Sequence, residues 1–320
     1  MASRTKKKRS RSASRRTSGN PAKRPVVEAG PVVLADWIGA ARLRTLPLAV
    51  APVILGTAAA QVTDRSLHWV LALACLAVAV LLQVGVNFAN DYSDGIRGTD
   101  RHRVGPARLT ASGRVPAKRV LITALVFFAL AAVAGLAIVI RTQQWWMLIV
   151  GAACIVAAWF YTGGKRPYGY NAMGELFVFV FFGLVAVLGT TWVQSFALPV
   201  EAWLAAVAAG LFACAVLLAN NLRDIDEDRA AGKRTLTVLI GKRATQVVYT
   251  LFVIVPFLIA AFFALLYPVA WLSLLVLLAI IPAVLIVWTY RTPRELIIAL
   301  SLTSLSSVGY AALMYWALAA

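Results

Sequence analysis

The sequence WVLALACLAVAVLLQVGVNFANDYSDGIRGTD, residues 69–100, runs from a long apolar segment directly into a cluster of carboxylates. A second segment, LLANNLRDIDEDR at residues 217–229, shows the same change of character. In the first segment Asn90 and Asp94 stand four residues apart, and the second segment repeats this spacing. Side chains four residues apart lie on one face of a helix. The pattern predicts two helices that each present a group of oxygens at one end.

The composition indicates what surrounds these helices. The chain has 320 residues, of which 61% are hydrophobic and only 14% are charged. Because a soluble domain carries about 25% charged residues, these values indicate an integral membrane protein. A β-barrel would show short alternating segments, whereas this chain has apolar runs of about 20 residues, the length of a membrane-spanning helix. We expect an all-α fold with nine transmembrane helices around a central cavity. The expected spans are residues 45–62, 68–90, 118–140, 145–163, 174–194, 200–222, 244–267, 270–290 and 296–318.

The basic residues indicate how these spans are oriented. If the N-terminus is cytoplasmic, all 31 Lys and Arg residues except Arg65 and Arg141 fall on the cytoplasmic side. Membrane proteins concentrate positive charge on that side. We therefore expect a cytoplasmic N-terminus, an external C-terminus and both carboxylate clusters at the cytoplasmic face.

Two parts of the chain differ in character. Residues 1–28 are rich in Lys, Arg and Ser, which predicts a basic disordered cytoplasmic tail, and residues 29–320 form the nine-helix domain. The net charge of +18 follows from the topology and this tail, so the lipid bilayer is the expected partner. No aromatic residues interleave with the basic ones, and a nucleic-acid partner is not expected. The oligomeric state does not follow from the sequence.

The carboxylate clusters predict a site for hard cations. Carboxylates this close together repel each other. Mg²⁺ relieves that repulsion, because it binds one or two carboxylates together with substrate phosphates. We therefore expect Mg²⁺ as cofactor and a diphosphate between the two clusters. The candidate metal ligands are Asn90, Asp91, Asp94, Asp224 and Asp228.

Basic and aromatic residues near the clusters are candidates for substrate binding. Lys165 stands four residues after Tyr161 at the end of the fourth expected span, so we expect both side chains to point to one place. A Lys can bind diphosphate oxygens, while the face of a Tyr ring can stabilise a carbocation. Arg42 and Arg44 end an amphipathic segment, residues 31–44, and are candidates to bind a carboxylated acceptor. The other candidates for substrate binding are Asn90, Arg97, Arg108, Asn220 and Lys233.

These motifs resemble the UbiA superfamily of intramembrane prenyltransferases. The resemblance rests on the two aspartate-rich segments, the Tyr161–Lys165 pair and the turn at residues 232–236, and it extends from about residue 36 to the C-terminus. It implies a Mg²⁺-dependent enzyme that binds a polyprenyl diphosphate. The residues that it implies for catalysis are Asp94, Asp224, Asp228, Tyr161 and Lys165.

Three further stretches resemble one branch of this superfamily. They are RLRTLP at residues 42–47, NDYSD with the residues that follow it at 90–108, and GE followed by FVFVFFG at 174–183. The branch prenylates 1,4-dihydroxy-2-naphthoate with loss of CO₂, which gives demethylmenaquinone in menaquinone biosynthesis. It implies a bacterial inner (plasma) membrane protein whose site faces the cytoplasm. In this branch the third acid of the first motif is displaced from Gly98 to Asp100, and whether Asp100 binds metal stays open.

Two alternatives remain at this point. One is a sibling prenyltransferase that uses another acceptor, such as 4-hydroxybenzoate. The other is a membrane transporter with acidic vestibules, which the near absence of charged residues inside the spans makes a poor match. The sequence does not give the length of the prenyl chain.

Overall fold

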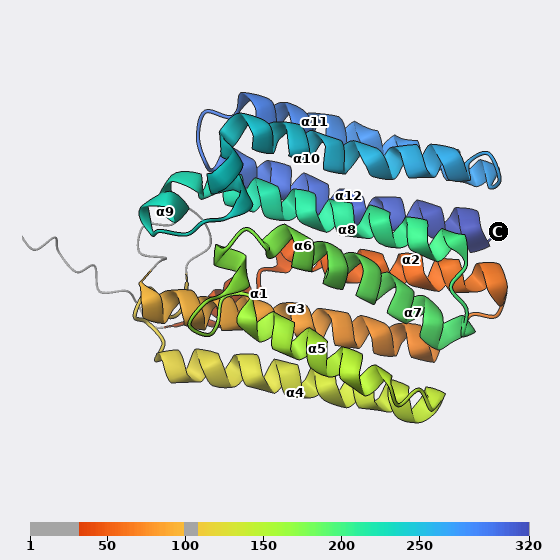
Figure 1. Ribbon diagram of the computed structural model, residues 1–320, viewed down its shortest axis with the longest axis horizontal. Coiled ribbons are helices and arrows are strands. Elements are labelled where there is room, and N and C mark those ends of the chain that lie inside the picture. The colour runs from red at the N-terminus through yellow and green to blue at the C-terminus, as the bar shows by residue number, and fades with distance from the viewer. Residues whose placement is uncertain (1–31, 99–107, 320) are drawn as a thin grey trace, which may run out of the picture. The chain divides into compact units, whose positions relative to one another are not determined.

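The computed structural model describes residues 32–98 and 108–319, and every regular element among them is a helix. The all-helical prediction is therefore confirmed for these residues (Figure 1). The predicted tail at 1–28, Asp100 and the loop at 103–107 lie outside the described residues. The elements in chain order are α1 (Leu34–Ala41), η1 (Leu43–Thr45), α2 (Pro47–Thr63), α3 (Trp69–Arg97), α4 (Ala117–Thr142), α5 (Met147–Phe160), η2 (Tyr168–Tyr170), α6 (Gly174–Val178), η3 (Phe179–Val185), α7 (Ala186–Ser195), α8 (Val200–Arg223), α9 (Ile225–Ala230), α10 (Leu236–Phe263), η4 (Pro268–Val276), α11 (Leu277–Thr289) and α12 (Glu295–Ala319).

Seven helical segments of the described chain are long and apolar enough to cross a membrane. An eighth span results if the α1–η1 segment and α2 are counted together, although a bend of 46° separates them. Pro47 opens α2, where a missing N–H costs nothing because the first turn has no partner for it. α5 has 14 residues and is shorter than the about 20 that span the hydrocarbon. The protein is thus a multi-pass membrane protein, and the predicted count of nine spans is not confirmed by helix length.

The most buried helix is α8, with 78% of its most apolar 18-residue window inside the bundle. Its alanines allow neighbouring helices to approach closely, as small residues do in membrane proteins. α8 packs closely against the π-helix η3, where a Cβ added to Gly183 would lie 2.8 Å from the Cα of Gly210. α8 is therefore held firmly in the middle of the bundle, and so is the carboxylate cluster that follows it.

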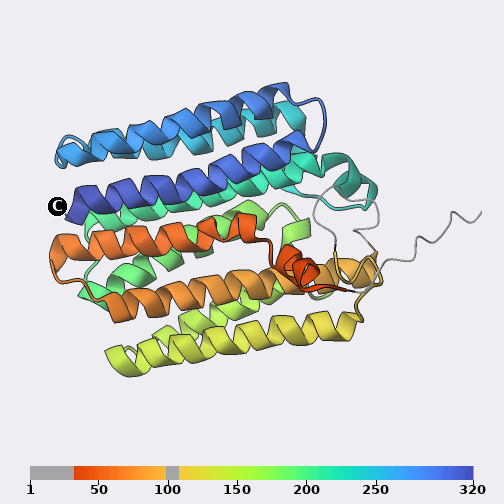
Figure 2. The same cartoon turned by 180° about the vertical axis from the view of Figure 1, so that it is seen from behind.

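The two carboxylate segments lie at the same end of the bundle, near α9, in both views (Figures 1 and 2). α3 continues through Asn90 and Asp94 and ends at Arg97. Gly98 caps it with a φ of 72°, which is accessible without strain because glycine has no Cβ. The second segment differs from the continuous helix that the sequence suggests. α8 ends at Arg223, and Asp224 leaves helical geometry with φ −99° and ψ 10° before α9 begins.

Candidate active site

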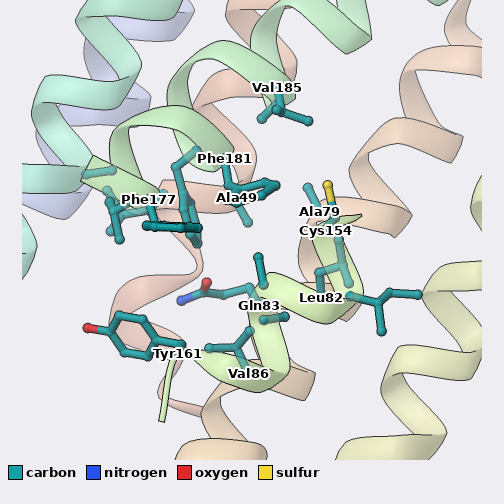
Figure 3. A pocket seen from close by; sticks show the side chains of 18 of the residues that line it. Ala49, Ala79, Leu82, Gln83, Val86, Cys154, Tyr161, Phe177, Phe181 and Val185 are labelled. Atoms are coloured by element: carbon teal, nitrogen blue, oxygen red, sulfur yellow. The ribbon is translucent and has the colours of Figure 1, made fainter. Parts of the chain in front are cut away.

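A cavity of about 560 Å³ brings the two predicted clusters together. Asn90 and Asp94 line it from α3, and Asn220 and Asp224 line it from the end of α8, with Asp228 of α9 beside them. The rest of the wall is largely apolar and comes from α2, α3, α4, α5, α6, η3, α7 and α8 (Figure 3). The cavity therefore has one charged end inside an otherwise hydrophobic bundle.

The first cluster is held by the loops around it. Asp94 is only 3% exposed and accepts hydrogen bonds from the Arg108 guanidinium, at 3.3 Å, and from the Tyr170 hydroxyl. The Oδ1 of Asn90 accepts a hydrogen bond of 2.7 Å from the Thr162 hydroxyl. These contacts fix both side chains at the cavity wall, with a cation next to the carboxylate.

The second cluster is paired with cations from its own segment. Arg223 donates two hydrogen bonds to Asp224, at 2.7 and 2.6 Å, and a third of 2.9 Å to Asn220. Neighbouring side chains do not face each other on a regular helix. Arg223 and Asp224 meet because the helix ends between them. Asp228 is paired with Lys233 at 3.2 Å.

Tyr170 contacts both clusters. Its hydroxyl donates to Asp94, while its ring lies 4.7 Å from the Nζ of Lys233, which pairs with Asp228. Its backbone carbonyl accepts the N–H of Arg234 at 2.8 Å. Because one side chain touches residues of two distant segments, Tyr170 helps to set the spacing between them. Neither Tyr170 nor Arg223 was predicted from the sequence.

Asp91, a predicted metal ligand, does not line the cavity. Its side chain is fully buried, and its two oxygens accept the backbone N–H groups of Leu109 and Thr110 at 2.9 Å each. The loop lies directly against α3 here, since a Cβ on Gly95 would be 2.4 Å from Thr110. In this structure Asp91 holds the loop that carries Arg108.

The other predicted substrate-binding residues divide into two groups. Arg42, Arg108 and Lys233 line the cavity, as do the clusters. The side chains of Arg44 and Lys165 are exposed and do not belong to its wall. Arg97 donates to the backbone carbonyls of the loop after α5 and lies 5.7 Å from the Tyr170 ring, so it supports the site from outside.

A row of aromatic rings follows the charged end of the cavity. Tyr161 meets Tyr168 edge to face at 5.5 Å, Tyr168 stacks on Phe177 at 4.1 Å, and Phe177 stacks on Phe181 at 6.1 Å. Burial raises the pKa of Tyr168, so its hydroxyl stays protonated and donates to a backbone carbonyl of α5 at 2.8 Å. Two nearby aromatic residues, Phe88 and Trp159, do not line the cavity and pack in a separate cluster.

Comparison with known proteins gives consistent matches. Residues 49–308 match the UbiA prenyltransferase family. The chain is 51% identical over 215 residues to the 1,4-dihydroxy-2-naphthoate octaprenyltransferase of Mycobacterium tuberculosis, covering 67% of this chain and 73% of that protein. It is 36% identical over 253 residues to the protein of the same name from Haemophilus influenzae, covering 77% and 82%. A structure of a UbiA homolog from Archaeoglobus fulgidus bound to GPP and Mg²⁺ has a TM-score of 0.61 at 15% identity, covering 87% of this chain and 99% of that one, which shows a shared fold.

Proposed function

Because this chain belongs to the UbiA prenyltransferase family, we propose that it transfers a polyprenyl group from polyprenyl diphosphate to 1,4-dihydroxy-2-naphthoate. The acceptor loses CO₂, and the product is the reduced form of demethylmenaquinone, an intermediate of menaquinone biosynthesis. The observation that carries this proposal is a pair of carboxylate clusters at one end of an apolar cavity. A polyprenyl diphosphate has the same division into a charged head and a hydrophobic tail.

The residues at the charged end suit Mg²⁺. No three His, Cys, Asp or Glu side chains gather in a cage within residues 32–98 and 108–319. Mg²⁺ needs no such cage, since it is typically held by one or two carboxylates together with substrate phosphates and water. Asn90 and Asp94 on one side, and Asp224 and Asp228 on the other, would hold it together with the diphosphate. When bound, Mg²⁺ would neutralise negative charge on the departing diphosphate.

Side chains of the cavity can bind the departing diphosphate and stabilise the prenyl cation. Arg108 and Lys233 now pair with carboxylates at the cavity wall, and the same groups can bind diphosphate oxygens as the C–O bond to the prenyl group breaks. The prenyl cation that remains needs a dry aromatic surface. Tyr161, Phe177 and Phe181 provide that surface directly beside the charged end.

The acceptor attacks this cation through the ring carbon that bears its carboxylate. A C–C bond forms, and the C–C bond to the carboxylate breaks with release of CO₂, so that the ring recovers its aromaticity. Arg42 lines the cavity and is the cation best placed to bind the acceptor carboxylate, whereas Arg44 is exposed. Lys165 is also exposed, which favours a role in attracting the diphosphate over one in holding it.

The proposed setting is the inner (plasma) membrane of a bacterium. In the proposed nine-span topology, the N-terminus and the carboxylate clusters face the cytoplasm, because the basic residues concentrate on that side. The C-terminus then lies outside. In this arrangement α5 and the bent α1–α2 segment complete the nine spans. Residues 29–320 form the catalytic domain and residues 1–28 a basic tail.

Mg²⁺ removal and substitution test the role of the clusters. Purified protein is given labelled polyprenyl diphosphate and 1,4-dihydroxy-2-naphthoate, with Mg²⁺ or with a chelator. We expect product only with Mg²⁺, and none from Asp94→Ala or Asp224→Ala. Full turnover by either variant, or in chelator, would refute a site built from both clusters.

A further inference from the structure

Four polar residues form a stripe along one face of α3: Gln83, Asn87, Asn90 and Asp94. Their spacing of four, three and four residues matches the helical repeat, and all four line the cavity. Asn90 and Asp94 belong to the first carboxylate cluster. Gln83 and Asn87 are the inner half of the stripe, and at about 1.5 Å per residue Gln83 lies about 16 Å along the helix from Asp94. Polar side chains inside a membrane are costly, so they usually have a function.

α8, which leads into the second cluster, has no matching stripe within its described residues. Asn220 and Asn221 are the polar wall residues at its end. Its wall residues further in are apolar, namely Ala213, Val216 and Leu217. A diphosphate bound between the two clusters therefore does not require the inner half of the stripe on α3.

The inner half of the stripe holds the bend between α1 and α2. The amide of Asn87 donates to the backbone carbonyl of Ala41 at 2.8 Å, and the Nε2 of Gln83 donates to the Oγ1 of Thr45 at 2.9 Å. Arg42 lies in this bend with φ 54°, an uncommon value for a residue that has a side chain, and its side chain lines the cavity. These bonds therefore hold in place the segment that carries the cation proposed for the acceptor carboxylate.

Gln83 also has an oxygen that these contacts do not use. The Thr45 hydroxyl donates its only hydrogen to the carbonyl of Arg42 at 2.9 Å, so its oxygen must accept from Gln83. This orients the Gln83 amide with Nε2 toward Thr45. Its Oε1 is buried and has no hydrogen-bond partner among the described residues, and Gln83 as a whole is 7% exposed. Figure 3 shows the amide pointing toward the side of the cavity where Phe177 and Tyr161 lie.

Helix packing alone does not explain this oxygen, because a buried acceptor without a donor is destabilising. Two other glutamines show the difference. Gln194 of α7 donates to the Oγ1 of Thr57 of α2 at 3.0 Å and is outside the cavity wall, so it serves as a contact between helices. Gln246 has an oxygen without a partner in the described chain, but it lies in the packed core away from the cavity. Of the three, Gln83 alone combines such an oxygen with a cavity in which a ligand can bind.

The chemistry of the reactants indicates which group meets this oxygen. A prenyl chain has no hydrogen-bond donor, and an ionised diphosphate offers only acceptor oxygens. The hydroxyls of 1,4-dihydroxy-2-naphthoate are donors. Its 1-hydroxyl lies next to the carboxylate and bonds to it within the molecule, which leaves the 4-hydroxyl free.

We propose that Gln83 selects the acceptor: its Oε1 accepts a hydrogen bond from the 4-hydroxyl while Arg42 binds the carboxylate. This inference rests on the proposed prenyl transfer and deepens it, since it names the residue that distinguishes a ring with two hydroxyls from a ring with one. A site that bonds to a substrate hydroxyl rejects the analogue that lacks it, because the buried polar group is then left unpaired.

The test compares 1,4-dihydroxy-2-naphthoate with 1-hydroxy-2-naphthoate, which lacks only the 4-hydroxyl. Calorimetry measures the Kd of each acceptor for the full-length protein, with Mg²⁺ and an unreactive thio analogue of geranyl diphosphate. Gln83→Met and Gln83→Leu remove the oxygen with residues that favour a helix as well as glutamine does, and Thr45 keeps a hydrogen bond from Asn87 at 3.4 Å. Gln194→Met is the matched control, because it removes the same kind of bond to a threonine away from the cavity wall.

We expect the wild-type protein to bind the dihydroxy acceptor about tenfold more tightly or better, which is the effect of one hydrogen bond. Both Gln83 variants should lose this preference by binding the dihydroxy acceptor more weakly, and Gln194→Met should keep it. Equal binding of the two acceptors by the wild type, a preference that survives in the Gln83 variants, or an equal loss for both acceptors would overturn the assignment. The last of these results would mean that Gln83 acts only by holding the bend at Arg42. Failure of the prenyl transfer itself would appear in a turnover assay with geranyl diphosphate, as a wild-type protein that forms no prenylated naphthalene.

Discussion

Replacing Asp91 tests whether this residue binds metal or holds a loop. Its side chain is 0% exposed and accepts two backbone N–H groups at 2.9 Å. A hydrogen bond to a charged group contributes about 1.5–3 kcal/mol, so Asp91→Ala should lower the free energy of unfolding by about 3–6 kcal/mol if the two bonds add. Asp91→Asn keeps one acceptor oxygen and should lose less. In Asp91→Ala the loop that carries Arg108 would lose both of these hydrogen bonds to α3.

The assay is thermal unfolding of the purified protein, with and without Mg²⁺ and prenyl diphosphate. One kcal/mol corresponds to about 2–4 °C in a chain of 150–250 residues, so a melting temperature about 6 °C lower or more is expected for Asp91→Ala. The variant should still be stabilised by Mg²⁺ with the diphosphate, because ligands that bind only the folded state raise its stability. Asp94→Asn is the matched control, and it should lose this ligand-induced rise. An Asp91→Ala protein that melts like wild type and gains nothing from Mg²⁺ would show that Asp91 is a metal ligand after all.

Two further substitutions separate the side chains around the clusters. Tyr170→Phe keeps the ring beside Lys233 and removes the hydrogen bond to Asp94. The Mg²⁺ concentration for half-maximal turnover should therefore rise, by about tenfold for a loss of 1.4 kcal/mol. Titration with Mg²⁺ measures this concentration, and an unchanged value would argue against a link between the clusters through Tyr170. Lys233→Ala should raise KM for prenyl diphosphate more than Lys165→Ala does, because Lys233 lines the cavity beside Asp228 and Lys165 is exposed. Steady-state kinetics at varied donor concentration measures both KM values. A larger increase in Lys165→Ala would identify Lys165 as the main diphosphate contact.

Much of the fold could be predicted from apolar length and charge alone, because a membrane helix must satisfy its own backbone and therefore has a characteristic length. The exceptions have local causes. α5 is short at 14 residues, and a bend of 46° separates the segment Leu34–Thr45 from α2, which is the first predicted span. Apolar length alone does not show where a helix ends or bends within or beside an apolar run.

The candidate site was predictable where the chemistry repeats along the chain. The spacing of Asn90 and Asp94 on an uninterrupted helix gave two residues that do line the cavity. Tyr170 could not be found this way, because its contacts with Asp94 and Lys233 arise only when three distant segments meet. Arg223 was not predicted as a site residue for a different reason. Its pairing with Asp224 requires the helix to end between them, which the apolar pattern does not reveal.

The most direct test of the proposed reaction follows the carboxylate of the acceptor. 1,4-Dihydroxy-2-naphthoate labelled in its carboxylate is incubated with the purified protein, Mg²⁺ and polyprenyl diphosphate, and 4-hydroxybenzoate is offered in a parallel reaction. We predict one labelled CO₂ released for each prenylated naphthalene product. We predict little product from 4-hydroxybenzoate, because its single ring fills the acceptor space incompletely and misplaces the reacting carbon. Product that retains the label, or equal turnover of the two acceptors, would contradict the proposed reaction and leave the family assignment in place.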